Sequence, residues 1–191
     1  MTKTSQPNDK SGVRIFDAEA MRRALRRIAH EIIEGNRDLS ALVLAGVPAR
    51  GVELARRLAT AIETIEKVRV TTGIIDVAMH RDDVRRRANL PIVRASHLPL
   101  PLEHRTVIIV DDVLFTGRTC RAAMDAIGSF GRPARIQFAV LIDRGHRELP
   151  IRPDYVGKNL PTARTERVRV RLENLDNEPD GVWLLKDHEP R

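Results

Sequence analysis

The sequence predicts an α/β fold with one central, mainly parallel sheet flanked by helices. Segments with helical spacing of apolar residues alternate with short runs of β-branched residues along the chain. This alternation is typical of parallel strands joined by crossover helices. The 191 residues suffice for one domain of ordinary size, without an internal repeat or linker. We expect a flexible tail over residues 1–13 and a single domain over residues 14–191.

The composition favours a globular protein of the cytoplasm with anionic partners. Hydrophobic residues make up 42% of the chain and charged residues 31%, and no apolar run is long enough to cross a bilayer. The polar start MTKTSQPNDK lacks the apolar core of a secretory signal, and a single cysteine cannot form an internal disulfide. We expect no membrane partner. The net charge of +7 favours phosphorylated metabolites or nucleic acid.

The first predicted helix begins after Asp17, which has the side chain of an N-cap. Phe16 before it and Met21 after it fit a hydrophobic staple. Apolar residues recur from Met21 to Ile32 at helical spacing, so one face of the helix should be buried. The other face carries the basic residues Arg22, Arg23, Arg26, Arg27 and His30.

The next elements alternate in type. Residues 41–46 form a short apolar strand ending in glycine, residues 51–67 repeat apolar side chains at helical spacing, and residues 68–77 read as a second strand. The segment 79–104 is charge-rich and then proline-punctuated, without a sustained period. We expect an extended arm or a mobile loop there, since long loops in compact domains are usually functional or disordered.

The second half continues the pattern. Strands are predicted at 105–110 and 135–143, with a helix at 117–130 between them. Cys120 should be a small buried side chain on that helix. The alternating residues 168–172 and the apolar residues 181–185 predict two edge strands.

The stretch VIIVDDVLFTGRT, residues 107–119, has the chemistry of a sugar-phosphate site. Ligands of open α/β sheets lie beyond the carboxyl ends of the strands, where Asp111 and Asp112 fall. The free N–H groups at the start of the next helix bind phosphate, and Gly117 lets the backbone approach it closely. The two carboxylates suit sugar hydroxyls or water on a Mg²⁺ ion.

Other interpretations of this stretch fit less well. A Walker loop or a dinucleotide-binding turn needs glycine patterns that are absent here. A receiver domain places acidic pairs at a strand end but lacks a phosphate turn after them. A plain acidic strand end with an N-cap would explain VDDV alone about as well, whereas the full stretch favours the ligand site.

The same stretch resembles the phosphoribosyl-pyrophosphate (PRPP) motif of type I phosphoribosyltransferases. The resemblance implies that family's fold, with a flexible β-loop and a small hood over the substrate. It implies that Asp111 and Asp112 are catalytic, hold the ribose hydroxyls of PRPP and bind Mg²⁺ through water. The PRPP-binding residues it implies are Ala49, Arg50, Asp111, Asp112, Val113, Leu114, Phe115, Thr116, Gly117, Arg118 and Thr119.

Four segments resemble one branch of that family, the bifunctional pyrimidine-operon attenuation regulators and uracil phosphoribosyltransferases. They are residues 21–34, 45–59, 111–119 and 131–162. The resemblance implies that uracil and PRPP give UMP and diphosphate, with Mg²⁺ as cofactor. Purine relatives carry an aspartate directly before the Thr-Gly, whereas this chain has Phe115, which agrees with a pyrimidine base.

The branch also implies three substrate-binding segments. GVPARG (46–51) matches the pyrophosphate loop, in which Arg50 would bind diphosphate and the Ala49–Arg50 peptide bond would be cis. HRDDVRRR (80–87) matches the start of the flexible catalytic loop, in which Arg81 would be catalytic and would reach diphosphate or PRPP. Residues 142–159 match the hood. The residues implied to bind uracil or UMP there are Arg144, Val156 and Lys158.

A second function follows from the same resemblance. In this branch, UMP or UTP lets the protein bind a stem-loop in pyrimidine-operon mRNA leaders and so promotes transcription attenuation. The implied RNA-binding residues are Arg22, Arg26, His30 and Arg164. A merely solvated arginine face stays open as an explanation of this charge.

Two alternatives to the bifunctional protein also stay open. One is a nucleotide-sensing RNA-binding regulator with little or no catalytic activity, and the other is a phosphoribosyltransferase for another base. The family tends to form homodimers or homotetramers.

Overall fold

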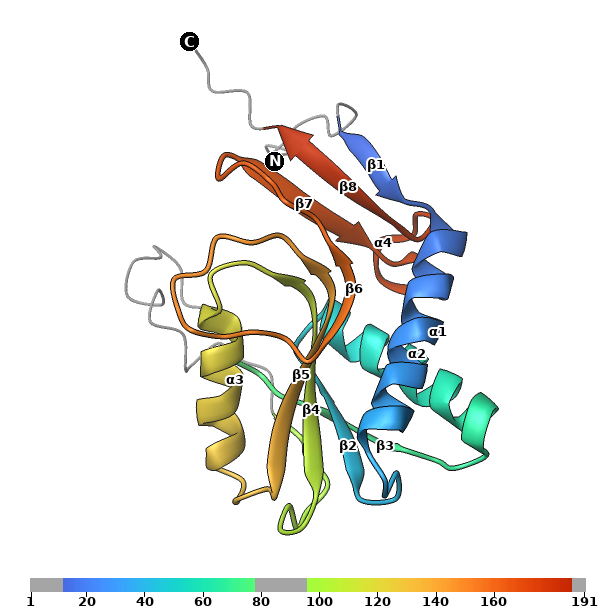
Figure 1. The fold of residues 1–191 in the computed structure, drawn as a ribbon, viewed down its shortest axis with the longest axis vertical. Coiled ribbons are helices and arrows are strands. Elements are labelled where there is room, and N and C mark those ends of the chain that lie inside the picture. The colour runs from blue at the N-terminus through green and yellow to red at the C-terminus, as the bar shows by residue number, and fades with distance from the viewer. Residues whose placement is uncertain (1–11, 78–95, 187–191) are drawn as a thin grey trace, which may run out of the picture.

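A computed structural model describes residues 12–77 and 96–186 of the chain (Figure 1). The expected tail and the expected start of the catalytic loop, with Arg81, lie largely outside these ranges. The elements in chain order are β1 (Val13–Phe16), α1 (Ala18–Gly35), β2 (Leu42–Gly46), α2 (Arg50–Glu66), β3 (Thr71–Ile74), β4 (Thr106–Leu114), α3 (Arg118–Gly128), β5 (Arg135–Asp143), β6 (Tyr155–Asn159), β7 (Glu166–Arg171), α4 (Glu173–Asp176) and β8 (Gly181–Lys186).

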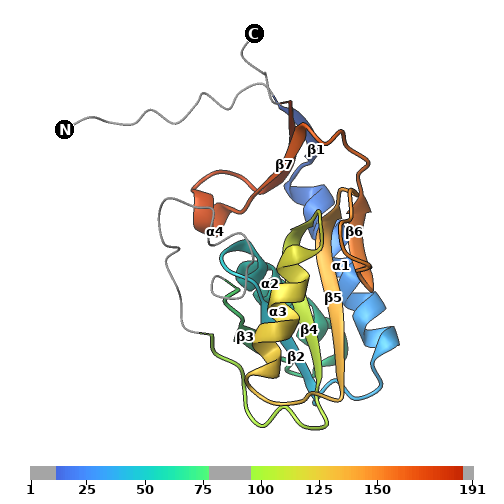
Figure 2. The ribbon, with the colours of Figure 1, turned by 90° about the vertical axis from the view of Figure 1, so that its left-hand side faces the viewer.

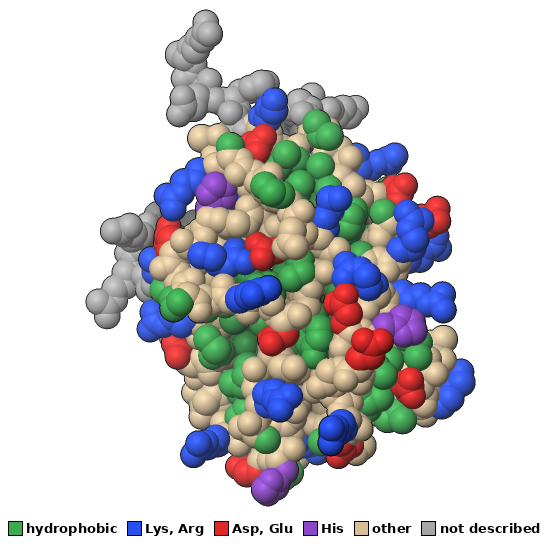
Figure 3. All heavy atoms as spheres, viewed as in Figure 1, with side chains coloured by type: hydrophobic (Ala, Val, Ile, Leu, Met, Phe, Trp, Pro, Cys, Tyr) green, Lys and Arg blue, Asp and Glu red, His purple; other side chains and the backbone are tan. Residues whose placement is uncertain are grey.

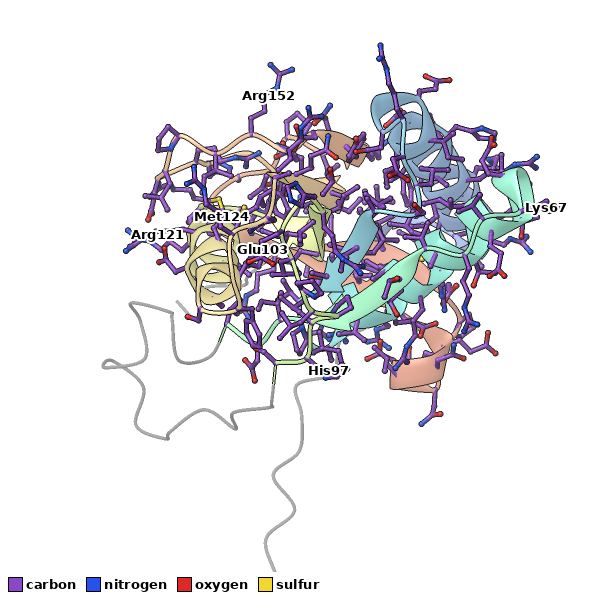
Figure 4. All side chains as sticks on the ribbon, turned by 90° about the horizontal axis from the view of Figure 1, so that it is seen from below. Lys67, His97, Glu103, Arg121, Met124 and Arg152 are labelled. Carbon is purple, nitrogen blue, oxygen red and sulfur yellow. The ribbon has the colours of Figure 1, made fainter. Side chains whose placement is uncertain are left out.

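The main sheet has five parallel strands in the order β3-β2-β4-β5-β6. Helices α1 and α2 cover one face and α3 covers the other (Figures 1 and 2). Seen from below, Arg121 and Met124 on α3 lie on one side of the sheet, and Lys67 at the end of α2 lies on the other (Figure 4). The predicted parallel sheet with helices on both faces is confirmed.

The core explains why the strand sequences are apolar without interruption. On β2, Leu42 and Leu44 pack under α1 and α2, whereas Val43 and Ala45 pack under α3. Successive side chains of a strand point to opposite faces, so a strand covered on both faces needs apolar residues at every position. Cys120 is buried in α3, and burial raises the pKa of its thiol to about 12.

Helix α1 begins where the sequence predicts. The Asp17 carboxylate accepts a hydrogen bond from the Ala20 amide (2.7 Å), and Phe16 and Met21 are both buried in the same core cluster. This pairing of a cap with a staple fixes the direction in which the chain enters the helix.

A small antiparallel sheet with the order β1-β8-β7, which we call the small sheet, lies beyond the carboxyl ends of β4 and β5 (Figure 1). The prediction of an edge strand at 181–185 is wrong, because β8 is the central strand. Its neighbour β1 comes from the start of the chain, where four residues give too short a pattern to predict a strand. Strand β6 was not predicted either.

Two other boundaries differ from the prediction. Strand β4 continues to Leu114 because β5 keeps pairing with it, up to Leu114 opposite Asp143, whereas β2 ends at Gly46 opposite Val110. The predicted strand at 68–77 is limited to β3. Within the predicted excursion, residues 96–104 pack on the sheet, with Leu98 and Leu102 buried. Among the described helices, none has the length and apolarity required to traverse a bilayer.

Candidate active site

The extended end of β4 carries the two aspartates, and the loop of residues 46–51 packs against it. The Val47 amide donates to the Val110 carbonyl (2.9 Å). A Cβ on Gly51 would lie 2.2 Å from the same carbonyl oxygen. Only glycine therefore allows the start of α2 to approach the strand this closely.

Asp111 and Asp112 have different surroundings because they follow one another in a strand. Asp111 is 8% exposed, and its carboxylate accepts from the Asp112 amide (2.9 Å). Asp112 lines a cavity, and its carboxylate accepts from the Val113 amide (2.9 Å). Burial raises the pKa of Asp112, and the positive charge of Arg50 opposes this shift. Of the two carboxylates, that of Asp112 is the one facing ligand space.

Residues 115–119, which we call the phosphate turn, join β4 to α3. Gly117 is the N-cap of α3 with φ 93°, a left-handed conformation that favours glycine. The Thr116 carbonyl accepts from the Glu148 and Leu149 amides (3.0 and 3.2 Å), and Arg118 pairs with the Glu148 carboxylate (2.9 Å). The turn is thus held from the hood side. The amides at the start of α3 lie at the positive end of the helix dipole, which favours anions.

The loop at 46–51 contains a non-proline cis peptide bond, between Pro48 and Ala49. The expectation of a cis bond between Ala49 and Arg50 is wrong. Ala49 already has helical backbone angles (φ −94°, ψ −36°) and α2 begins at Arg50, so the Ala49–Arg50 bond belongs to the first helical turn.

Arg50 and Asp112 line one cavity of about 750 Å³, which we call the Arg50 cavity. The Arg50 Nη2 donates to the Asp176 Oδ1 (2.6 Å). The Arg50 Nε is buried and has no hydrogen-bond partner in the part of the chain that the structure describes. Strand β7 and the residues after it form the rest of the wall, with Arg167, Val168, Arg169, Val170, Arg171, Asp176, Glu178 and Leu185.

Sequence reasoning missed this wall. Arginines at 167, 169 and 171 alternate with valines, and this spacing places the three on one face of a strand. That signal was present in the sequence. Nothing in it, however, indicated that β7 crosses the carboxyl end of the main sheet.

The chain between β7 and β8, residues 172–180, which we call the α4 segment, is fastened to α2 by a polar network. Glu53 is 8% exposed and accepts from Arg57 Nε (2.9 Å) and Asn174 Nδ2 (2.8 Å). Arg57 donates to both carboxylate oxygens of Asp180 (2.5 and 3.2 Å), and Asp180 also accepts from the Glu173 amide (2.9 Å). Since α2 begins with Arg50, this network sets the position of the α4 segment relative to the Arg50 cavity.

Asp180→Asn is expected to lower the free energy of unfolding by about 2 kcal/mol at pH 7, a typical value for a hydrogen bond to a charged group. Burial alone would raise the pKa of Asp180, but hydrogen bonds from Arg57 and the Glu173 amide outweigh it and lower the pKa below its ordinary value of 3.8. A lowered folded-state pKa adds stability above the ordinary value, and this stability is lost as the pH falls through the folded-state pKa.

The free energies of unfolding of wild type and variant, measured with urea, should therefore show the full difference at pH 7 and become equal in strong acid. The matched control is Asp125→Asn, because Asp125 forms an exposed pair with Arg121 on α3 (3.6 Å). Its effect should stay within about 0.5 kcal/mol. A difference for Asp180→Asn that did not depend on pH would contradict this explanation.

Arg144 is a buried link between the hood and the phosphate turn. It is 6% exposed, and its guanidinium lies 4.1 Å from the centre of the Phe115 ring. It donates to Thr162 Oγ1 (3.1 Å) and to the Ala163 carbonyl (3.0 Å). Desolvation by burial lowers the pKa of Arg144. These contacts place Arg144 beside the turn and occupy two of its nitrogen atoms within the protein.

The other two residues expected to bind the base lie on β6. The Val156 carbonyl accepts from Arg27 (2.9 Å), as does the Gly157 carbonyl (2.6 Å). The Lys158 ammonium lies 5.8 Å from the centre of the Phe16 ring. Arg27 therefore holds β6 against α1, although it is exposed on the predicted basic face of the helix.

Three of the four expected RNA-binding residues share one surface. Arg22, Arg26 and His30 line a groove of about 800 Å³ between α1 and α2, which we call the helix groove. Arg56 and Arg57 of α2 line it too, and sequence reasoning missed them. Basic side chains gather along the edge formed by α1, with acidic ones among them (Figure 3). Arg164 instead lies 3.8 Å from the Glu148 carboxylate.

Comparisons with known proteins agree with this geometry. The family model of the phosphoribosyl transferase domain matches residues 11–173. A hypoxanthine phosphoribosyltransferase from Staphylococcus aureus superposes with a TM-score of 0.69 at 18% identity, covering 97% of this chain and 98% of that one. A hypoxanthine phosphoribosyltransferase from Trypanosoma cruzi in complex with the product IMP gives 0.66 at 21% identity, covering 95% and 94%. The class is therefore the phosphoribosyltransferase fold, and the expected type I fold is confirmed.

Sequence comparison defines the branch. The chain is 55% identical to the bifunctional protein PyrR of Roseiflexus sp. (strain RS-1), over 90% of this chain and 94% of that protein. It is 54% identical to the bifunctional protein PyrR of Deinococcus radiodurans, over 92% and 94%. The chain belongs to the phosphoribosyltransferase family and, within it, to the PyrR branch.

Proposed function

We propose that the chain is a uracil phosphoribosyltransferase that also regulates pyrimidine biosynthesis genes by binding their mRNA leaders in the cytoplasm. The observation that carries the enzyme is the meeting of Asp112 and Arg50 in one cavity at the carboxyl end of the main sheet. The glycine N-cap of α3 directly follows the same strand. These parts supply acceptors for a ribose diol, a cation for diphosphate and amides for a 5′-phosphate.

Catalysis by these residues is positioning and charge stabilisation. The amides and hydroxyls of the phosphate turn hold the 5′-phosphate of PRPP, while Asp111 and Asp112 orient the ribose. Arg50 and the loop amides take the diphosphate, which must leave as uracil N1 attacks the anomeric carbon. Holding both reactants in line lowers the barrier to the chemical step, because their translational freedom is already lost on binding. Fixed charges stabilise the separating anion.

The carboxylates also fit Mg²⁺. The described residues contain no group of three or more histidine, cysteine, aspartate or glutamate side chains that could hold a metal ion by themselves. Mg²⁺ usually keeps several waters and binds one or two carboxylates together with substrate phosphates. Asp111 and Asp112 would hold it through water, and Mg²⁺ supplies neutralisation of the diphosphate charge.

The base is assigned to the space between the phosphate turn and the hood. Phe115 on the turn forms an edge contact with His146, with ring centres 5.8 Å apart, and a stack with Arg144. We assign uracil recognition to Arg144, Val156 and Lys158, and PRPP contact to Arg81 of the catalytic loop. An apolar ring in place of a carboxylate at position 115 supports a pyrimidine over a purine.

The test is conversion of radiolabelled uracil to UMP with PRPP and Mg²⁺, beside cytosine, guanine, hypoxanthine and orotate. Turnover of uracil alone is expected. Turnover of another base would contradict the assigned specificity. Binding of UMP without any turnover would favour the alternative, a nucleotide-sensing RNA regulator with little or no activity. The pairing of Asp112 with a cation for diphosphate favours retained catalysis, since sensing UMP needs no diphosphate site.

We assign RNA binding to the helix groove, in which Arg22, Arg26 and His30 are exposed and Arg56 adds a cation from α2. Arginine and lysine contacts to phosphates supply most of the affinity of such surfaces and position the RNA. Arg164 would contact the RNA from outside the groove. UMP or UTP is the expected effector, and a homodimer or homotetramer would present several such grooves to one RNA.

Arg26→Ala and His30→Ala are expected to weaken binding of a pyrimidine-leader stem-loop while leaving uracil turnover unchanged. Loss of one phosphate contact should also reduce the slope of log K against log salt concentration by about one. Filter binding with UMP over a range of salt concentrations measures both. The matched control is Arg23→Ala, because exposed Arg23 on the same helix pairs with Glu19. Equal loss in all three variants would mean a nonspecific effect of charge.

A further inference from the structure

The α4 segment places two carboxylates against arginines of the Arg50 cavity. Asp176 pairs with Arg50, and Glu178 pairs with Arg171. All four side chains line the cavity. The cavity that should receive a highly charged diphosphate is therefore already supplied with anions from the protein.

Arg50 lies between two carboxylates. Asp112 interacts with its charge from β4, and Asp176 accepts its Nη2 at 2.6 Å from the α4 segment. The pair is only partly exposed, with 34% of the Arg50 side chain and 23% of the Asp176 side chain accessible. Its charges are therefore less screened than those of a surface pair.

Asp176 itself is held in place. Its Oδ2 accepts from the Leu172 amide (2.8 Å), and the network of Glu53, Arg57 and Asp180 fastens the surrounding segment to α2. The segment and Arg50 thus share one support, and Asp176 cannot move away without losing a backbone hydrogen bond.

The contact between Asp176 and Arg50 uses little of what the guanidinium offers. One Nη2 bond is formed, while the buried Nε is without a partner among the described residues. A phosphate can accept from Nε and Nη2 at once, and such two-bond contacts are stronger and more specific. A diphosphate is therefore the better acceptor, but it approaches a second anion as it binds.

We propose that Asp176 is a positioning residue. It occupies Arg50 in the ligand-free protein, and diphosphate must displace it from Arg50 in order to bind. This inference rests on the proposed role of Arg50 as the diphosphate ligand. Asp176 keeps the guanidinium oriented at the start of α2, and it selectively weakens the binding of ligands that bring an anion to Arg50. PRPP and diphosphate are such ligands. UMP is not, because its single phosphate belongs to the phosphate turn.

Asp176→Asn tests this, because asparagine removes the charge and can still accept the Leu172 amide. Calorimetric titration with inorganic diphosphate should show about five-fold tighter binding, the upper range for one partly exposed charge pair. Binding of UMP should change less than two-fold. In steady-state assays KM for PRPP should fall while kcat does not rise. Asp176→Ser, which also removes the charge, should behave in the same way.

Two controls complete the design. Glu173→Gln removes one charge from α4 at an exposed position and should leave the diphosphate affinity unchanged. In an Arg50→Gln background, Asp176→Asn should have no effect on diphosphate, because the two residues act through one contact. The unfolding temperature of each variant, compared with that of the wild type, shows whether the variant keeps its structure.

The outcomes separate the two claims. If Arg50→Gln alone leaves diphosphate affinity unchanged, Arg50 is not the diphosphate ligand, and both the assignment and this inference fall. If Arg50→Gln weakens diphosphate but neither Asp176 variant tightens it, only the inference falls. Equal tightening of UMP and diphosphate binding, or the same effect from Glu173→Gln, would show that only the net charge matters. Either result would overturn the inference about Asp176.

Discussion

Asp112→Asn should reduce the turnover of uracil by about 100-fold or more, the usual cost of removing one charge-positioning group from an active site. Asp112 lines the Arg50 cavity, whereas its neighbour Asp111 is buried and accepts the Asp112 amide. Asparagine keeps the shape and one acceptor oxygen but lacks the charge that orients ribose and Mg²⁺. Steady-state kinetics with PRPP and uracil measure the loss.

The same variant should stay folded, and at pH 7 it should unfold at a higher temperature than the wild type. Burial raises the pKa of Asp112, so the ionised carboxylate destabilises the folded state above its ordinary pKa of 3.8. Removing it should stabilise the protein at pH 7, and the difference should vanish in acid, where both states hold the proton. Unchanged kinetics would refute the assigned role, and a lower unfolding temperature would show that the loss of activity is structural.

Gly51→Ala should be damaging to both stability and activity. The new Cβ would lie 2.2 Å from the Val110 carbonyl oxygen and 3.3 Å from the Asp111 Cα, which are backbone atoms of a central strand. The first turn of α2 must move away, at a cost of about 2 kcal/mol or more. Arg50 moves with it, and a displacement of about 1 Å in an active site can cost about 100-fold in rate.

Gly128→Ala is the matched control for this substitution. Gly128 is the last residue of α3, and a Cβ there would have nothing within 4 Å. Alanine restricts the unfolded chain, so this variant should be neutral or more stable by about 0.5 kcal/mol. Thermal unfolding and uracil turnover measured on both variants give the comparison. A tolerated Gly51→Ala would mean that α2 and β4 are not in the close contact described.

Elements with a local residue pattern could be predicted from the amino-acid sequence. The caps and apolar spacing of α1, the doubly buried strands β2 and β5 and the phosphate turn after β4 depend on neighbours within a few residues, which a single segment contains. The stretch from 107 to 119 also carries its chemistry in order, because strand, carboxylates, turn and helix follow one another. For this reason the class of ligand could be predicted before any fold was known.

Features that depend on partners far apart in the chain could be seen only in the folded structure. Strand β8 became central because β1 pairs with it from the opposite end of the sequence, and β4 continued past its aspartates because β5 pairs with it there. The contact of Arg50 with Asp176 joins residues 126 positions apart. The groove that unites α1 with Arg56 depends on how two helices pack. Such contacts follow from packing of whole elements, and no local pattern of residue types contains that information.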